Sequence, residues 1–164
     1  MRPEIFPNFL SVSLTSSSRS LSTVAFVFMP KTTFPARFEY LDEIRDLVAQ
    51  TAREGGFSEK AVYSLQLAAD EAASNIIEHA YEGITDAFFE ITCDMLDDSI
   101  VITMHDTGRP FDPSKVKQPN IKADLSDRQI GGLGIYLMRK LMDEVSYESN
   151  STTGNLLTML KRRG

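Results

Sequence analysis

The chain has 164 residues, 42% of them apolar and 24% charged, which indicates one globular domain with its own core and leaves no room for two ordinary domains. A formal net charge of −6 disfavours a nucleic-acid surface, so an anionic ligand would have to be held by local donors and a metal ion. The single cysteine, Cys93, excludes an internal disulfide and a multi-cysteine metal site, and it makes a cytoplasmic setting the default expectation.

The N-terminal part of the chain lacks a regular pattern. Residues 11–23 are rich in serine and have neither helical nor strand periodicity, which predicts a disordered or loosely attached segment. A secretory signal is the weaker alternative because no small-residue cleavage site follows, and the apolar run 24–29 is far too short to span a bilayer. We therefore expect residues 1–28 to be dispensable and residues 29–164 to form the working domain, so that a chain beginning at Met29 should still fold.

The next segments predict an edge strand and two helices. Residues 24–34 are β-branched and aromatic, and the neighbouring prolines limit their pairing, as expected of an edge strand. Residues 39–54 carry apolar side chains at helical spacing, and the glycine pair 55–56 ends this helix. Ser58 is a good N-cap for a second helix that should end near residues 81–83.

The pattern then changes from helical to alternating. Two hairpins are predicted, one from residues 87–95 and 100–105 and one from residues 145–148 and 156–160, and Cys93 should be a small core residue of the first. Between the hairpins lie a long polar segment, residues 112–130, of the kind that often forms a lid, and a third helix opened by Gly131-Gly132-Leu133-Gly134. The sum predicts a two-layer α/β sandwich with three main helices on one face of a mixed, mostly antiparallel sheet.

The second helix carries a line of polar side chains beside its apolar stripe. Glu71, Asn75 and His79 are each four residues apart, which places a carboxylate, an amide and an imidazole on one helix face. Polar groups so close to an apolar stripe should be half-buried. Such a line is either a satisfied structural network or a functional site.

Each polar signal also has an ordinary structural interpretation. The glycine cluster can be a helix start that needs close packing, and Asp106-Thr107-Gly108 can be a plain turn. Glutamate in a helix usually belongs to a solvated face, and His79 is more often a packing residue than a metal ligand. What strengthens these signals is their order along the chain: a helix with E-x-x-x-N, a strand ending in D-x-G, a long loop, and G-x-G opening a helix.

That order resembles the nucleotide-binding motifs of the GHKL (histidine-kinase-like ATPase) fold. Within this group the chain is most similar to the anti-sigma-factor serine/threonine kinases of bacterial partner-switching systems. The similarity runs from about Thr32 to Lys161 and rests on four pieces: FPARFEYLDEIR, ADEAASNIIEHAY, HDTGRPFDP and GGLGIYLMRKLMDEVSYES followed by GNLLTMLK. It implies that residues 29–164 form a GHKL-type ATP-binding kinase domain.

The resemblance also implies roles for individual residues. Asn75 would coordinate the Mg²⁺ that bridges the nucleotide phosphates, and Glu71 would be the general base for an incoming Ser or Thr hydroxyl. Asp106 would accept a hydrogen bond from the adenine amino group, and Gly108 would let the backbone pass close to the base. Phosphate contacts are implied for Gly132 and Gly134 at the start of the third helix, and for either Lys122 or Arg128 in a lid over residues 115–130.

The implied protein is a kinase that phosphorylates an anti-anti-sigma (STAS) protein with ATP and Mg²⁺ and sequesters a sigma factor, without direct nucleic-acid or membrane binding. The resemblance further implies a homodimer and a partner contact through Arg45, whose alternative is a solvated helix charge. One departure is Arg109-Pro110 after Gly108, where the family often has a second glycine, so the loop path past the base should differ. The rival interpretation is a nucleotide-dependent binding module of the same fold that transfers nothing; Glu71 favours the kinase.

Overall fold

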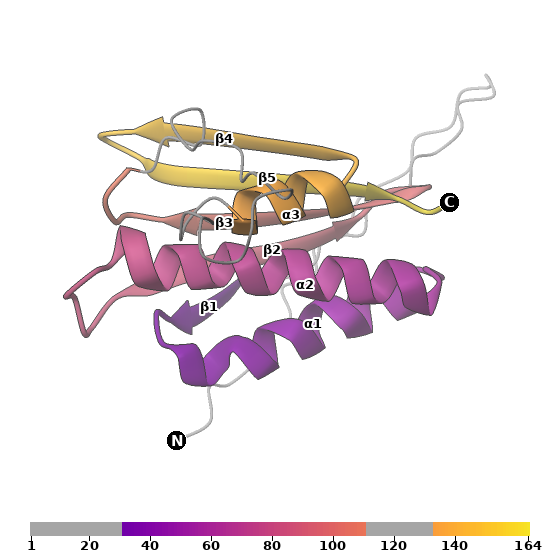
Figure 1. Ribbon diagram of the computed structural model, residues 1–164, viewed down its shortest axis with the longest axis horizontal. Helices are drawn as coiled ribbons and strands as arrows, with labels where there is room; N and C mark the ends of the chain where they lie inside the picture. Colours follow the sequence, from indigo (N-terminus) through magenta and orange to yellow (C-terminus); the bar gives the residue numbers. More distant parts are fainter. Residues whose placement is uncertain (1–30, 111–132) are drawn as a thin grey trace, which may run out of the picture.

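A computed structural model describes residues 31–110 and 133–164 of the chain (Figure 1). The segment expected to be dispensable, residues 1–28, and the expected lid, residues 115–130, lie outside the described residues. The prediction of an edge strand over 24–34 is testable only in its last part, where the structure has a strand.

Five strands form one sheet in the order β1-β2-β3-β5-β4, and each pairing among the described strands is antiparallel. The strands are β1 (Thr32–Pro35), β2 (Phe88–Met95), β3 (Ser99–Asp106), β4 (Glu144–Asn150) and β5 (Gly154–Arg162). β1 is an edge strand, as predicted. The two predicted hairpins are β2–β3 and β4–β5, and β3 pairs with β5 to join them.

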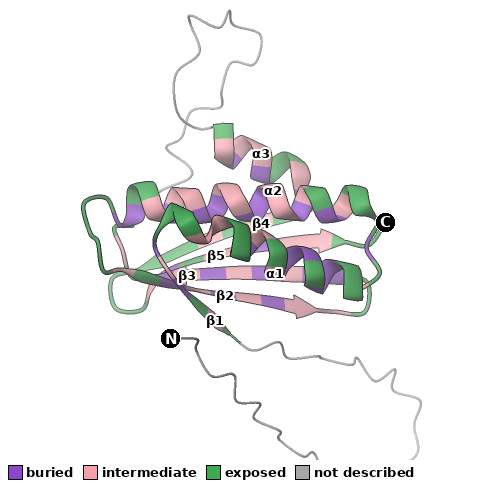
Figure 2. Ribbon diagram, turned by 90° about the horizontal axis from the view of Figure 1, so that it is seen from below, coloured by how far each residue is buried: buried purple, intermediate pink, exposed green. Residues whose placement is uncertain are grey.

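The helices lie together over one face of this sheet (Figures 1 and 2). They are a short 3-10 turn η1 (Phe38–Tyr40), α1 (Leu41–Glu54), α2 (Glu59–Asn75), a π-helical turn η2 (Ile76–Ala80) and α3 (Leu133–Leu141). The predicted two-layer α/β sandwich is therefore confirmed. Within the described ranges, no helix has the length and apolar character that crossing a membrane would need.

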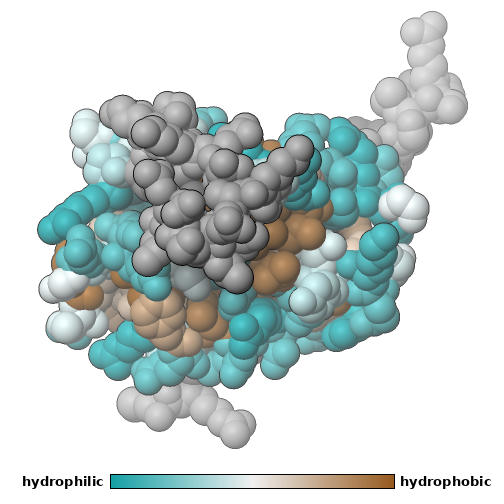
Figure 3. Space-filling model, viewed as in Figure 1, coloured by the Kyte–Doolittle hydropathy of each residue, from teal (hydrophilic) through white to brown (hydrophobic). Residues whose placement is uncertain are grey.

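The core lies between the helices and the sheet and follows from simple periodicities. In β2 every second side chain is buried (Phe89, Ile91 and Cys93), because successive strand residues point to opposite faces. Cys93 is a core residue as predicted, and burial raises the pKa of its thiol to about 12, so it stays an inert neutral group. The face of the molecule seen in Figure 3 is mostly hydrophilic, with apolar side chains visible beside the grey atoms.

α2 begins and packs as its sequence predicts. The Ser58 side chain accepts a hydrogen bond from the Ala61 N–H at 3.3 Å and so caps the helix. The predicted apolar stripe is buried along its whole length: Leu65, Ala69, Ala72, Ala73, Ile76 and Ala80. Because four of these six side chains are alanine, α2 can lie close to the sheet.

This helical segment ends at Ala80, close to the predicted residues 81–83, but its last turn is not the regular α-helix that the spacing predicted. After Asn75 the chain makes a π-turn, in which the Tyr81 N–H donates to the Ile76 carbonyl, five residues earlier, at 3.1 Å. The turn contains one residue more than an α-helical turn, so it rotates the following side chains out of the expected line. The prediction that His79 is a packed residue at the helix end is therefore wrong: its side chain is 57% exposed.

Candidate functional site

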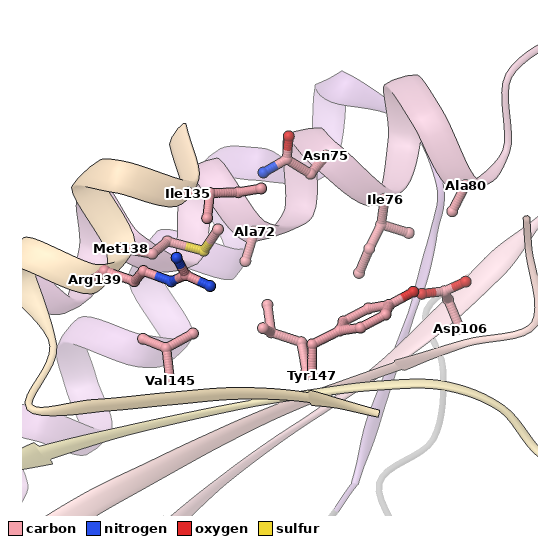
Figure 4. A pocket seen from close by; sticks show the side chains of 11 residues that line it. Ala72, Asn75, Ile76, Ala80, Asp106, Ile135, Met138, Arg139, Val145 and Tyr147 are labelled. Carbon is pink, nitrogen blue, oxygen red and sulfur yellow. The ribbon is translucent and has the colours of Figure 1, made fainter. Parts of the chain in front are cut away.

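A pocket opens between α2, η2 and α3 on one side and the strands β3, β4 and β5 on the other (Figure 4). Among the described residues, its walls are mostly apolar, and the polar lining groups come from four side chains: Asn75, Asp106, Arg139 and Tyr147. The apolar lining residues are Ala72, Ile76, Ala80, Ile135, Met138, Val145 and Leu157. A mostly apolar cavity with a few placed polar groups is typical of a small-molecule site.

Asp106 lies at one end of the pocket, where β3 ends (Figure 4). It is only 5% exposed, and its Oδ1 accepts two hydrogen bonds, from the Gly108 N–H at 2.8 Å and from Asn155 Nδ2 at 2.7 Å. Among the described residues, no donor bonds the other carboxylate oxygen, Oδ2. The pocket therefore offers a buried, fixed acceptor at this end, which suits the amino group of a base.

Asn155 is a site residue that the sequence reasoning missed. Ser149 donates its hydroxyl to Asn155 Oδ1 at 2.8 Å, which fixes the amide so that Nδ2 faces Asp106. Asn155 is 2% exposed and stands opposite Asp106 in the β3–β5 pairing. Its role depends on that register, and the local sequence around it predicts only a turn.

Gly108 brings the loop after β3 against the end of the helix. A Cβ at this position would lie 2.5 Å from the Ala80 carbonyl oxygen, so only glycine fits. The next residue, Arg109, donates its N–H to the same oxygen at 2.8 Å, while its side chain points away to Glu82 at 3.2 Å. Arg109-Pro110 after Gly108 therefore does not prevent the close approach of Gly108 to the Ala80 carbonyl.

At the start of α3, three predicted site residues come together. A Cβ at Gly134 would overlap Glu71 Oε2 and would lie 3.5 Å from Asn75 Nδ2, so the backbone of α3 passes directly over both side chains. Glu71 and Asn75 are one turn apart on α2, as the sequence predicted. The first turn of a helix offers free N–H groups to an anion, so this is a suitable place for phosphate.

Glu71 sits in surroundings that oppose its charge. The pKa of its carboxyl is raised above the usual value, first by burial and then by the neighbouring carboxylates of Asp70 and Glu78. A carboxylate with a raised pKa holds a proton more strongly, which suits a general base.

Asn75 carries an unsatisfied polar atom. Its Nδ2 is buried and has no hydrogen-bond partner, which is costly unless a ligand supplies one. Rotation of the amide by half a turn would present Oδ1 at the same place, and such an oxygen is a proper ligand for Mg²⁺. In the described ranges, no group of three or more His, Cys, Asp or Glu side chains could hold a metal ion.

Two further pocket residues also gave no signal in the sequence. In Figure 4 the guanidinium of Arg139 points into the pocket from α3, and no described residue pairs with it. Tyr147 lines the floor from β4. Arg139 supplies a positive charge that would favour an anionic ligand.

The remaining predicted residues are placed as follows. Arg45 bridges α1 and α2, with Nη1 donating to Asp70 Oδ1 at 2.8 Å and Nη2 contacting Asp42, so its charge is already paired. The partner contact expected of Arg45 stays a prediction. Gly132, Lys122 and Arg128 lie outside the described residues.

Comparison with known proteins gives one family. Residues 34–161 match the model of the histidine kinase-like ATPase domain. The chain is 35% identical over 117 residues to the serine-protein kinase RsbW of Listeria monocytogenes serovar 1/2a, a match that covers 68% of this chain and 73% of the relative. The RsbW of Bacillus pumilus is 33% identical over 135 residues, covering 79% and 83%.

One solved structure shares the fold. It is the crystal structure of the RsbU and RsbW domains of a Mycobacterium tuberculosis protein, with a TM-score of 0.55 over 82% of this chain and 32% of that chain. At 14% sequence identity, this likeness concerns the fold alone.

Proposed function

The chain belongs to the histidine kinase-like ATPase family and, within it, to the RsbW group of serine-protein kinases, and on this premise we propose that it phosphorylates a small anti-anti-sigma (STAS) protein and sequesters a sigma factor. The donor would be ATP with Mg²⁺, and the acceptor a Ser or Thr hydroxyl. The cytoplasmic setting and the homodimer expected from the sequence stay predictions.

One juxtaposition carries this proposal. Glu71 and Asn75 lie against Gly134 at the start of α3, and Asn75 lines the same pocket as Asp106. ATP has a base at one end and phosphates at the other, and these two groups of residues have the matching chemistry. Asp106 Oδ2 would accept from the adenine amino group, and the N-terminal turn of α3 would receive the phosphates.

Glu71 would act as the general base. The acceptor hydroxyl oxygen attacks the γ-phosphorus, the bond between that phosphorus and the β,γ-bridging oxygen breaks, and ADP leaves. The hydroxyl proton passes to the Glu71 carboxylate, whose raised pKa favours this transfer. Asn75 would hold Mg²⁺, which neutralises phosphate charge when bound.

The test is incubation of the protein with γ-labelled ATP, Mg²⁺ and the STAS-type protein from the same genome. We expect label on a Ser or Thr of that protein. Glu71→Gln should lower kcat by roughly 10²- to 10⁴-fold, the usual contribution of a general base, with ATP affinity kept within a few-fold.

Glu43→Gln is the matched control, because Glu43 is an exposed glutamate of α1 and is not one of the neighbours that raise the pKa of Glu71. It should keep nearly full phosphotransfer at neutral pH. If wild type binds ATP and labels nothing, the nucleotide-dependent binding module is correct instead. If Glu71→Gln transfers phosphate at the normal rate, the base assignment is wrong.

A further inference from the structure

The loop that follows Asp106 is fixed by three consecutive backbone donors. Thr107 N–H donates to the Tyr81 hydroxyl at 2.9 Å, Gly108 N–H to Asp106 Oδ1 at 2.8 Å, and Arg109 N–H to the Ala80 carbonyl at 2.8 Å. Two of these three acceptors belong to the end of the π-turn. The conformation of the loop is therefore set by Ala80 and Tyr81 as much as by Asp106 itself.

Tyr81 is buried, and its hydroxyl makes this contact from the interior. It is 6% exposed, its hydroxyl donates to the Phe88 carbonyl at 2.8 Å, and the Thr107 hydroxyl lies 3.3 Å away. The phenolic oxygen thus joins the start of β2 to the loop after β3. Phenylalanine would fill the same space but leave the Thr107 N–H and the Phe88 carbonyl without this partner.

The π-turn forms part of the pocket wall. It starts directly after Asn75 and finishes at Ala80, which lines the pocket beside Asp106. π-turns inside helices are rare and frequently occur at functional sites. Here the extra residue brings the Ala80 carbonyl and the Tyr81 ring to the loop that would pass the base.

We propose that Tyr81 is a positioning residue for the nucleotide base: its hydroxyl, with the Ala80 carbonyl, holds the loop 107–109 so that Asp106 Oδ2 faces the adenine amino group. Tyr81 does not line the pocket and acts through this loop. The inference rests on the proposed ATP site and adds to it a residue that does not line the pocket.

The test compares Tyr81→Phe with the wild-type full chain. The dissociation constants of Mg²⁺-ATP and Mg²⁺-ADP should rise by the same factor, roughly 3- to 30-fold, the cost of one to two lost buried hydrogen bonds. The kcat at saturating ATP should stay within about two-fold, since Glu71 and Asn75 are not touched. Hydrogen exchange of the Thr107 amide should be faster in the variant without nucleotide.

Tyr63→Phe is the matched control, because it also removes a tyrosine hydroxyl, at a residue of α2 that is 66% exposed. It should bind both nucleotides as wild type does. A merely structural Tyr81 would lower the melting temperature of Tyr81→Phe and leave the dissociation constants of the folded variant unchanged; that result would overturn the inference. A loss confined to ATP would overturn it too, because it would place the effect at the γ-phosphate.

If Tyr81→Phe does not fold at the assay temperature, Gly108→Ala perturbs the same loop from the side of the Ala80 carbonyl. It should weaken ATP and ADP equally, and unchanged affinity would overturn the inference. The proposed function has a separate readout: if wild type itself binds no ATP, that function fails, whereas wild-type binding with an equally tight Tyr81→Phe rejects only the positioning role.

Discussion

At the scale of single residues, Glu71 shows how the surroundings of a carboxyl group change its pKa. Burial and two neighbouring carboxylates, Asp70 and Glu78, all disfavour its charged form. The folded protein holds the charged form of this carboxyl in a poor environment, whereas the unfolded chain exposes it to water. A residue that is useful as a base is therefore a source of instability.

This leads to a pH-dependent stability difference. Because the folded pKa of Glu71 lies above its unfolded value, the stability associated with the protonated form is present at low pH and is lost as pH rises through the folded pKa. Glu71→Gln cannot lose a proton, so its melting temperature should exceed that of wild type at pH 7 to 8. The difference should shrink toward zero as pH falls below about 4, under the ordinary pKa of glutamate.

Thermal unfolding followed by circular dichroism across this pH range measures the effect. Glu43→Gln, at an exposed glutamate of α1, is the control and should show no such pH-dependent gain. A melting temperature of Glu71→Gln below that of wild type at neutral pH would contradict the account of Glu71.

Residues whose placement follows from helix spacing could be predicted, and those whose placement follows from strand register could not. The spacing of Glu71 and Asn75 places them on one face of any helix, and Gly134 follows from the loop-to-helix pattern. Asn155 reaches Asp106 only because β5 pairs with β3 in one register. That register is a property of the whole sheet, so no local pattern reveals it.

At the scale of elements, α2 also combines a feature that the local sequence determines with one that depends on distant segments. Its start is determined by local chemistry, since the Ser58 side chain satisfies a free backbone donor of the first turn. Its end is determined by distant segments, since Ala80 and Tyr81 at the π-turn accept hydrogen bonds from the loop after β3. The start and the approximate end were predicted correctly, and the π-turn was not.

The cap can be tested by removing its hydroxyl. Ser58→Ala should lower the free energy of unfolding by about 0.5–2 kcal/mol, because one donor of the first turn loses its partner. Ser64→Ala removes a hydroxyl that bonds the Lys60 carbonyl at 3.1 Å inside the same helix, and it should change stability by less than about 0.5 kcal/mol. Urea denaturation of both variants is the measurement, and equal losses would mean that Ser58 is no effective cap.

At the scale of the whole molecule, the layered fold could be predicted because the apolar periodicity of each segment indicates whether it forms a helix or a strand. Helical spacing in three segments and alternation in the hairpins leave few arrangements for a chain of this length. The joining of the two hairpins through β3 and β5 required the structure. The pocket lies between α2, α3 and the ends of the central strands, so it depends on this long-range pairing.

A ligand that joins these elements should stabilise the whole domain. Mg²⁺-ATP at about 100 times its dissociation constant would add about 2.7 kcal/mol to the free energy of unfolding. For a domain of this size that corresponds to a rise in melting temperature of roughly 5–10 °C. Differential scanning fluorimetry with ATP, with and without EDTA, should show this rise only when Mg²⁺ is present.

Asn75→Ala should abolish the rise, because it removes the side chain expected to hold Mg²⁺ at the start of α3. The variant's own melting temperature without nucleotide provides the baseline. A full Mg²⁺-dependent rise in Asn75→Ala would show that the metal is held elsewhere.

The π-turn has a consequence for chain length. Its surplus residue is a matter of residue count between Asn75 and Tyr81, so substitutions that keep the length cannot remove it. Deletion of one residue from Ile76–Ala80 would restore ordinary α-helical winding and turn the Ala80 carbonyl and the Tyr81 ring by about 100°. The exposed positions Glu78 and His79 should therefore accept other side chains, while the loss of a single position would separate the helix from the loop that it holds.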